Sequence, residues 1–152
     1  MIIAKNPESA AHLQRQFAER TAKKTYIAIT NGKPKLNAAK IDLPIGRNPS
    51  APSTFRIDPN GKPAQTTYHV LAENDTQSLV ELKPTTGRTH QLRVHLAHLN
   101  APILGDRVYG KSSDCRMMLH AQKLEITLPS GERKVFEAAV PDEFKKFFPE
   151  DL

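Results

Sequence analysis

The sequence predicts a mixed α+β domain in which a predominantly antiparallel sheet is flanked by helices. Short runs that alternate apolar and polar residues are separated by turn-forming residues, as in antiparallel hairpins. Other segments repeat apolar residues at the spacing of an amphipathic helix. The 152 residues can bury an apolar core, and the single cysteine excludes an intramolecular disulfide framework. We therefore expect residues 1–152 to form a single domain.

The first predicted helix covers residues 7–20, where apolar residues recur at helical spacing behind Ser9, a suitable N-cap. Residues 25–30 are rich in β-branched side chains and stop at Asn31 and Gly32. This segment is predicted to be a strand that ends in a turn.

The middle of the chain is dominated by proline and then by strand patterns. Residues 44–64 contain five prolines and two glycines, a density that excludes a helix. They are expected to form a mobile, basic, exposed loop or a pair of short edge strands. Residues 66–73 and 78–84 are predicted to be the two strands of a hairpin joined across Asn74 and Asp75.

The second predicted helix covers residues 89–100, where leucines stand at i, i+4 and i+7, and it ends at Asn100. Two further strands are predicted at 117–128 and 134–140, on either side of a Pro-Ser-Gly turn. A short terminal helix over 142–148 completes the chain.

The charge balance favours an anionic partner. The chain has 22 Lys and Arg against 16 Asp and Glu, a net charge of +6, and a pI near 9.6. Positive potential speeds encounter with phosphate backbones, although a merely basic protein has the same composition. Because the basic residues are spread along the chain, the fold must assemble any binding surface.

The sequence indicates a cytoplasmic protein. No apolar run approaches the ~20 residues that span a bilayer, and the opening residues are too short an apolar stretch for a signal peptide. The lone cysteine fits a reducing compartment.

The segment most informative about chemistry is 87–95, in which a glycine turn leads into a helix start. Such a corner presents free backbone N–H groups to an anion, and Arg88 stands on it. An Arg that satisfies a neighbouring carbonyl or carboxylate for structural reasons fits the same pattern. On a helical wheel Arg88, Gln91, His95 and His98 lie beside the leucine seam, so we expect half-buried polar groups with partners.

Other chemistries are disfavoured by spacing. His90 and His95 are five residues apart, with no thiolate or carboxylate pair nearby, which does not suit zinc. No Gly-x-Ser-x-Gly element or phosphate-binding glycine loop occurs in the sequence. The residues therefore disfavour a zinc site, a serine nucleophile on such an elbow and a nucleotide-binding glycine loop.

Six segments share a further resemblance. In order they are Ala4–Asn6, Lys24–Ala28 with Gly32, Gly61–Ala64, Gly87–His95, Pro102–Asp106 with Tyr109 and Gly110, and Leu119–Ala121. Over nearly the whole chain, this series closely resembles the RluA-type pseudouridine synthases. The block at 87–95 is the most specific part of the match.

The resemblance implies an enzyme that isomerises selected uridines in structured RNA, ribosomal or transfer RNA, without cofactor or metal. By similarity, Tyr26 matches the tyrosine that stacks on the flipped uracil, and Arg88 matches the arginine that pairs with the catalytic aspartate. An Arg fork would hold that carboxylate bidentately and keep it ionised.

Four further residues are candidate RNA contacts. Arg47 and Lys62 lie in the proline-rich segment and are candidates for phosphate contacts. His90 and Gln91 lie in the block that contains Arg88.

The sequence departs from the family at the nucleophile. In the family, a motif of the form RLDxxTSG carries the catalytic aspartate and directly precedes Ala-Lys-Asn, here Ala4–Asn6. No aspartate of the 152 residues stands in that context. We therefore expect the C-terminal, larger part of an N-terminally truncated catalytic domain, which is inactive as given and leaves Arg88 without its carboxylate. We also expect a strand at 2–5 with an exposed edge that invites self-association.

Two alternatives stay open. The chain could be a non-catalytic RNA-binding module derived from this fold, or a basic domain that shares the fold alone.

Overall fold

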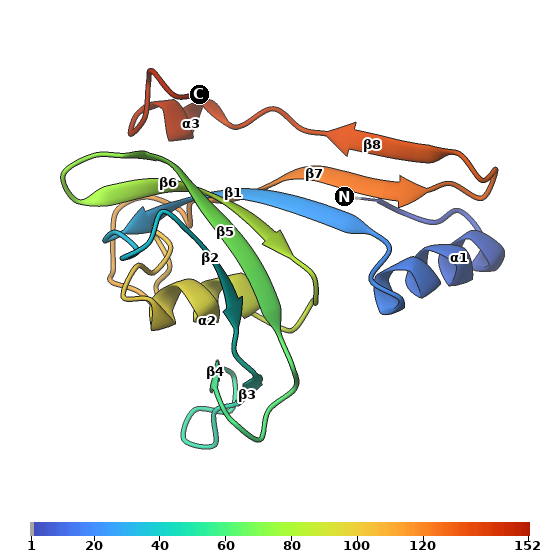
Figure 1. The fold of residues 1–152 in the computed structure, drawn as a ribbon, viewed down its shortest axis with the longest axis horizontal. Helices are drawn as coiled ribbons and strands as arrows, with labels where there is room; N and C mark the ends of the chain where they lie inside the picture. Colours follow the sequence, from blue (N-terminus) through green and yellow to red (C-terminus); the bar gives the residue numbers. More distant parts are fainter. Residues whose placement is uncertain (1) are drawn as a thin grey trace.

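A six-stranded sheet organises the computed structural model, which describes residues 2–152 (Figure 1). Its order is β2-β5-β6-β1-β7-β8, and every neighbouring pair is antiparallel. The strands are β1 (Lys23–Asn31), β2 (Ala38–Asp42), β5 (Gln65–Glu73), β6 (Gln77–Pro84), β7 (Leu119–Thr127) and β8 (Arg133–Glu137). The predicted fold class, a mixed α+β domain with a mainly antiparallel sheet, is confirmed.

Helices cover both faces of the sheet (Figure 1). Because strand side chains alternate between faces, Ala28 of β1 packs with the leucines of α2 (Gln91–His98), on one side. Ile27 and Ile29 pack on the other side, with Phe144 of α3 (Asp142–Lys145). The sheet therefore separates two apolar clusters.

The N-terminal helix α1 (Pro7–Ala18) lies beside β7; it begins at the predicted residue and ends two residues earlier than predicted. The N-cap is Asn6, whose side-chain oxygen accepts the Ser9 N–H at 2.8 Å, so the predicted cap Ser9 lies inside the helix. Pro7 tolerates the first turn because its missing N–H would have no helical partner there.

The proline-rich segment forms a small hairpin of its own. Strands β3 (Ile45–Arg47) and β4 (Phe55–Ile57) form a two-stranded sheet, as the prediction of two short strands allowed, and Ile45 also makes an isolated bridge to Lys62. The segment is not exposed throughout, because Ile45 is buried against α2 with Ala64. Gly61 permits the close return of the chain, since a Cβ there would lie 2.4 Å from the carbonyl carbon of Ile45.

Several predicted boundaries were wrong. Residues 2–4 belong to no strand, so the strand expected at 2–5 does not exist. The helix expected over 89–100 is confined to α2, because His90 and Asn100 both adopt positive φ angles near 57°. Strand β2 was not predicted. Within residues 2–152, no helix is long and apolar enough to cross a membrane.

Candidate RNA-binding and active-site groove

A buried polar network builds the corner that precedes α2. Gln91 is 4% exposed, and its side-chain oxygen accepts the backbone N–H of Arg88 at 3.0 Å and the hydroxyl of Thr86 at 2.7 Å. Its amide nitrogen donates to the hydroxyl of Thr66 at 3.0 Å and to the carbonyl of Gln65. Every polar group of this side chain therefore has a protein partner, and the network fixes the backbone at Arg88.

The same network continues along α2 to His95. The Thr66 hydroxyl lies 2.9 Å from Nδ1 of His95, and Nε2 of His95 lies 2.9 Å from the carbonyl oxygen of Leu43. Burial lowers the pKa of His95, which favours the neutral ring that this pattern needs. Of the stripe expected to be half-buried and partnered, Arg88 is as predicted, since it is half-buried and bonds to Pro63. Gln91 and His95 have partners but are fully buried, and His98 is exposed.

Tyr26 and Arg88 line one cavity of about 260 Å³. Arg88 donates from Nε to the carbonyl of Pro63 at 2.9 Å. Tyr26 lies at an irregularity in β1, where the register with β7 shifts between Thr25 and Tyr26. Such bulges change the direction of side chains and are common next to active sites. Burial raises the pKa of Tyr26, so its phenol keeps its proton at neutral pH. The structure thus places in one cavity the two residues that the family resemblance singled out as catalytic.

Lys24 lines the same cavity, and sequence reasoning did not single it out as a site residue. Its ammonium donates to the carbonyl of Thr86 at 3.3 Å, and burial lowers its pKa. The available signal was its position two residues before Tyr26 on a strand, since such residues share a face of a regular strand.

Two further cavities share lining residues with this one. A cavity of about 430 Å³ shares Arg88 with it and is lined by Arg47 and Lys62 of the β3–β4 region. A cavity of about 420 Å³ shares Lys24 and Tyr26 with it and reaches β7 and β8. We call these three cavities, which share lining residues, the groove. His90 lines the central cavity. Gln91 lines it too, although its side chain is buried in the hydrogen-bond network described above.

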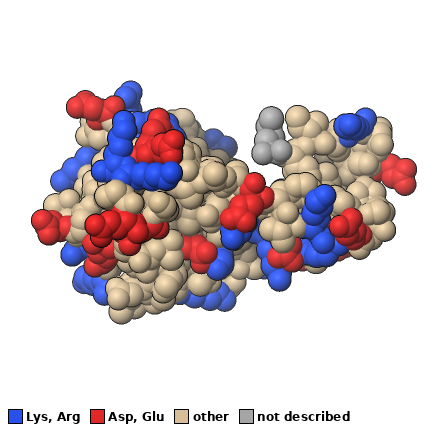
Figure 2. Space-filling model, turned by 90° about the horizontal axis from the view of Figure 1, so that it is seen from above, with Lys and Arg blue, Asp and Glu red and all other residues tan. Residues whose placement is uncertain are grey.

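The basic residues in and around the groove differ in whether they form ion pairs. Among the described residues, the ion pairs do not include Lys24, Arg47, Lys62 or Arg88. On β7, β8 and α3, by contrast, basic residues pair with acidic ones, and Figure 2 shows the two signs interspersed when the molecule is viewed from above. The cations without an ion-pair partner therefore lie in the central cavity and in the one lined by the β3–β4 region. Arg93 of the central cavity pairs with Asp106, and Lys123 of the cavity at β7 and β8 pairs with Glu137. An anionic ligand would gain most beside the unpaired cations.

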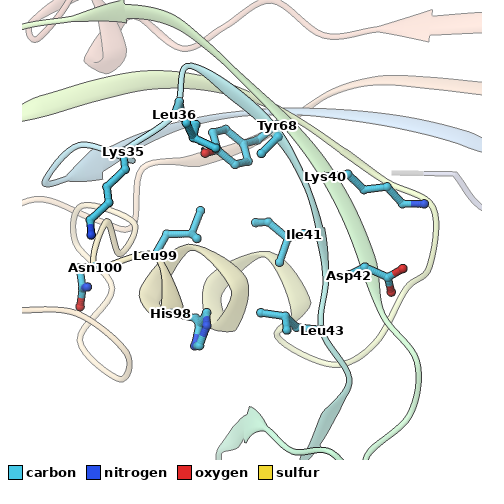
Figure 3. A pocket seen from close by; sticks show the side chains of 11 residues that line it. Lys35, Leu36, Lys40, Ile41, Asp42, Leu43, Tyr68, His98, Leu99 and Asn100 are labelled. Atoms are coloured by element: carbon cyan, nitrogen blue, oxygen red, sulfur yellow. The ribbon is translucent and has the colours of Figure 1, made fainter.

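A cavity of about 780 Å³ lies elsewhere, between β2 and α2 (Figure 3). Leu36, Ile41, Leu43 and Leu99 give it an apolar wall, and it contains none of the predicted site residues. We therefore place the candidate site in the groove.

Comparisons with known proteins identify the class to which this chain belongs. Residues 1–98 match the family model described as RNA pseudouridylate synthase. The chain is 43% identical over 150 residues to an uncharacterised RNA pseudouridine synthase of Zymomonas mobilis, covering 95% of this chain and 68% of the relative. It is 41% identical to the dual-specificity RNA pseudouridine synthase RluA of Escherichia coli, covering 91% of this chain and 66% of that protein.

A solved structure agrees with this match. The human RNA pseudouridylate synthase domain containing 1 superposes with a TM-score of 0.80 and 37% identity, over 93% of this chain and 63% of that one. The chain belongs to the RluA-type pseudouridine synthase family. It spans about half the length of several other curated relatives, 50% of one from Bacillus subtilis and 45% of one from Nitrosomonas europaea.

Proposed function

We propose that this chain is the larger part of the catalytic domain of a pseudouridine synthase, which isomerises uridines in structured ribosomal or transfer RNA. The observation that carries the proposal is the central cavity of the groove, which Tyr26 and Arg88 both line beside Lys24, a cation that is in none of the ion pairs of the described residues. The family membership supports the reaction class. The groove supports an RNA partner, because it offers cations with no carboxylate partner.

In this proposal the target nucleotide leaves its stack and enters the central cavity, where the ring of Tyr26 stacks on the uracil. The glycosidic bond breaks, the base turns, and it is rejoined through carbon 5. Arg88 orients and keeps ionised the nucleophilic carboxylate. Its Nε is already held by Pro63, which leaves the two terminal nitrogens as the fork for that group.

Arg47 and Lys62 are proposed to contact phosphates around the target, since both are exposed and line the outer cavity next to Arg88. We propose an indirect contribution to RNA binding for Gln91. Its donors and acceptors are occupied by protein groups, so it acts by fixing the backbone of Arg88.

The RNA contacts are tested by Arg47→Ala in a binding titration at several salt concentrations. Binding should weaken for all structured RNAs, and the slope of log K against log salt should fall by about 0.7–0.9, the value for one lost phosphate contact. An unchanged slope would count against a phosphate contact at Arg47.

We further propose that the nucleophile comes from a segment outside these 152 residues, and that this chain alone does not carry out the reaction. The test is tritium release from RNA labelled at uridine carbon 5. It compares this chain with the same chain extended at its N-terminus by a segment carrying the aspartate motif. Release only by the extended protein supports the proposal, and release by this chain alone refutes it.

The same two proteins distinguish the enzyme from the alternative, a non-catalytic RNA-binding module. RNA binding by both proteins without tritium release from either would favour that alternative.

A further inference from the structure

One phenolic oxygen joins three segments next to the groove. The hydroxyl of Tyr109, in the turn that follows α2, accepts the backbone N–H of Phe55 at 2.9 Å. It also lies 2.7 Å from Nδ1 of His90, the residue just before α2. Phe55 opens β4, so the oxygen bridges the β3–β4 hairpin and the corner that carries Arg88.

The aromatic rings around this oxygen pack edge to face. His90 lies 5.5 Å from the ring of Phe55 and 5.5 Å from that of Tyr109, centroid to centroid, with interplanar angles of 81° and 73°. Both are favourable aromatic geometries. His90 has a left-handed backbone, which non-glycine residues rarely adopt, and its side chain turns to Tyr109 without capping the helix.

Tyr109 is itself held by a buried ion pair. Arg93 donates to both carboxylate oxygens of Asp106, at 2.7 and 2.9 Å, and its guanidinium lies 4.8 Å from the centroid of the Tyr109 ring. Asp106, which is 1% exposed, also accepts the backbone N–H of Tyr109. The ring therefore rests on a rigid, charged support, and it presents its hydroxyl to the hairpin from a fixed position.

The hairpin has few other polar ties to the body of the protein. Among the hydrogen bonds of residues 2–152, the one from Phe55 to Tyr109 is the only one that links residues 45–58 to a segment outside 43–64. The Arg47 guanidinium packs over the ring of Phe55, 5.2 Å from its centroid. A shift of Phe55 would therefore move Arg47 relative to Arg88, across the outer cavity that both line.

We propose that Tyr109 is a positioning residue for RNA binding. Its hydroxyl fixes the β3–β4 hairpin against the start of α2 and so sets the separation of Arg47 from Arg88 across the groove. This inference rests on the proposed function, and it assigns to Tyr109 a role in affinity and none in the chemical step. Burial, with the charge of Arg93, lowers the pKa of His90 against the opposing effect of Asp106, which suits a neutral ring that accepts from the hydroxyl.

The test is Tyr109→Phe, which removes one hydroxyl and keeps the ring on Arg93. Tyr68→Phe is the matched control. Tyr68 is 3% exposed and donates to the carbonyl of Leu36 at 2.9 Å, in the cavity of Figure 3 and away from the hairpin. Each variant thus loses a hydroxyl that bonds to a backbone group.

Two measurements on the 152-residue chain read the result. Amide hydrogen exchange at residues 55–57 should accelerate about tenfold in Tyr109→Phe, the equivalent of one lost hydrogen bond, and stay unchanged in Tyr68→Phe. The Kd for a fluorescently labelled, unmodified transfer RNA transcript should rise about three- to tenfold in Tyr109→Phe only.

A double-mutant cycle separates positioning from a general loss of stability. If Tyr109 acts through the hairpin, its effect on the Kd should largely disappear in an Arg47→Ala background. Full additivity of the two changes would overturn the inference, as would unchanged exchange and Kd in Tyr109→Phe, or equal effects in Tyr68→Phe. If the unaltered chain does not bind the transcript, the proposed function fails first. If it binds and Tyr109→Phe binds equally well, only the role of Tyr109 fails.

Discussion

Replacing Asp106 by Asn tests how much the buried ion pair beneath the groove contributes to stability. The carboxylate is 1% exposed and accepts two hydrogen bonds from Arg93 and two from the backbone N–H groups of Val108 and Tyr109. Asn keeps the shape and one oxygen but loses the charge. Arg93, whose side chain is 17% exposed, would then be a largely buried cation without its counter-ion.

The expected loss is about 3 kcal/mol in the free energy of unfolding, the lower end of the roughly 3–5 kcal/mol found when one partner of a buried pair is removed. The lower end applies because Arg93 still reaches some water and still packs on Tyr109. For a domain of this size, that loss corresponds to a fall of about 10 °C in Tm.

Urea and thermal unfolding followed by circular dichroism measure the effect. Asp142→Asn is the control, since Asp142 pairs with Lys145 on an exposed surface and should change stability little. A loss of less than about 1 kcal/mol in Asp106→Asn would refute the reasoning, because the pair would then be no stronger than a surface one.

The pH dependence gives an independent check. Burial alone would raise the pKa of Asp106, but the hydrogen bonds from Arg93, Tyr109 and Val108 outweigh it and hold the pKa below its ordinary value. A lowered carboxyl pKa contributes stability that is present above the ordinary value and is lost as the pH falls through the folded-state value. Asp106→Asn should therefore lose less stability on acidification than the unaltered chain.

Three further predictions concern single side chains. Lys24→Met should weaken RNA binding and flatten its salt dependence. Lys23→Met changes an exposed residue of β1 and should leave the salt slope closer to that of the unaltered chain; equal effects of the two variants would exclude Lys24 from the site. His95→Gln should reduce the loss of unfolding free energy as the pH falls below about 6.5, because a buried His with a lowered pKa makes the folded state bind fewer protons than the unfolded one. An unchanged pH profile of urea unfolding would contradict this. Val135→Lys should reduce self-association through the edge strand β8, where Val135 is 54% exposed. If the unaltered chain sediments as a monodisperse monomer at high concentration, this expectation is refuted.

The local pattern of the sequence was sufficient for most elements. The leucine spacing gave α2, the alternation in 66–73 and 78–84 gave the β5–β6 hairpin, and proline density excluded a helix over 44–64. These predictions succeeded because they rest on interactions between residues close in the chain. Strand β2 was missed because five residues with one buried isoleucine become a strand only when β5 offers its edge.

The N-cap shows the same limit on a smaller scale. Ser9 and Asn6 are both good caps, and their order along the chain does not say which backbone turns first into the helix. In the structure Asn6 is extended and Ser9 is helical, because Pro7 fits the first turn and disfavours a helical conformation for the residue before it.

By itself, the sequence determined the family and the fold class, and through the family resemblance it singled out Tyr26 and Arg88, since these depend on residue identity and order. Only the tertiary structure decided that Lys24 joins them, that Gln91 serves the backbone of Arg88, and that Tyr109 holds the hairpin. Phe55 and Tyr109 are far apart in the sequence, yet they meet at 2.9 Å. Such a contact follows from the packing of the hairpin, α2 and the 105–110 turn against one another, which no local pattern encodes.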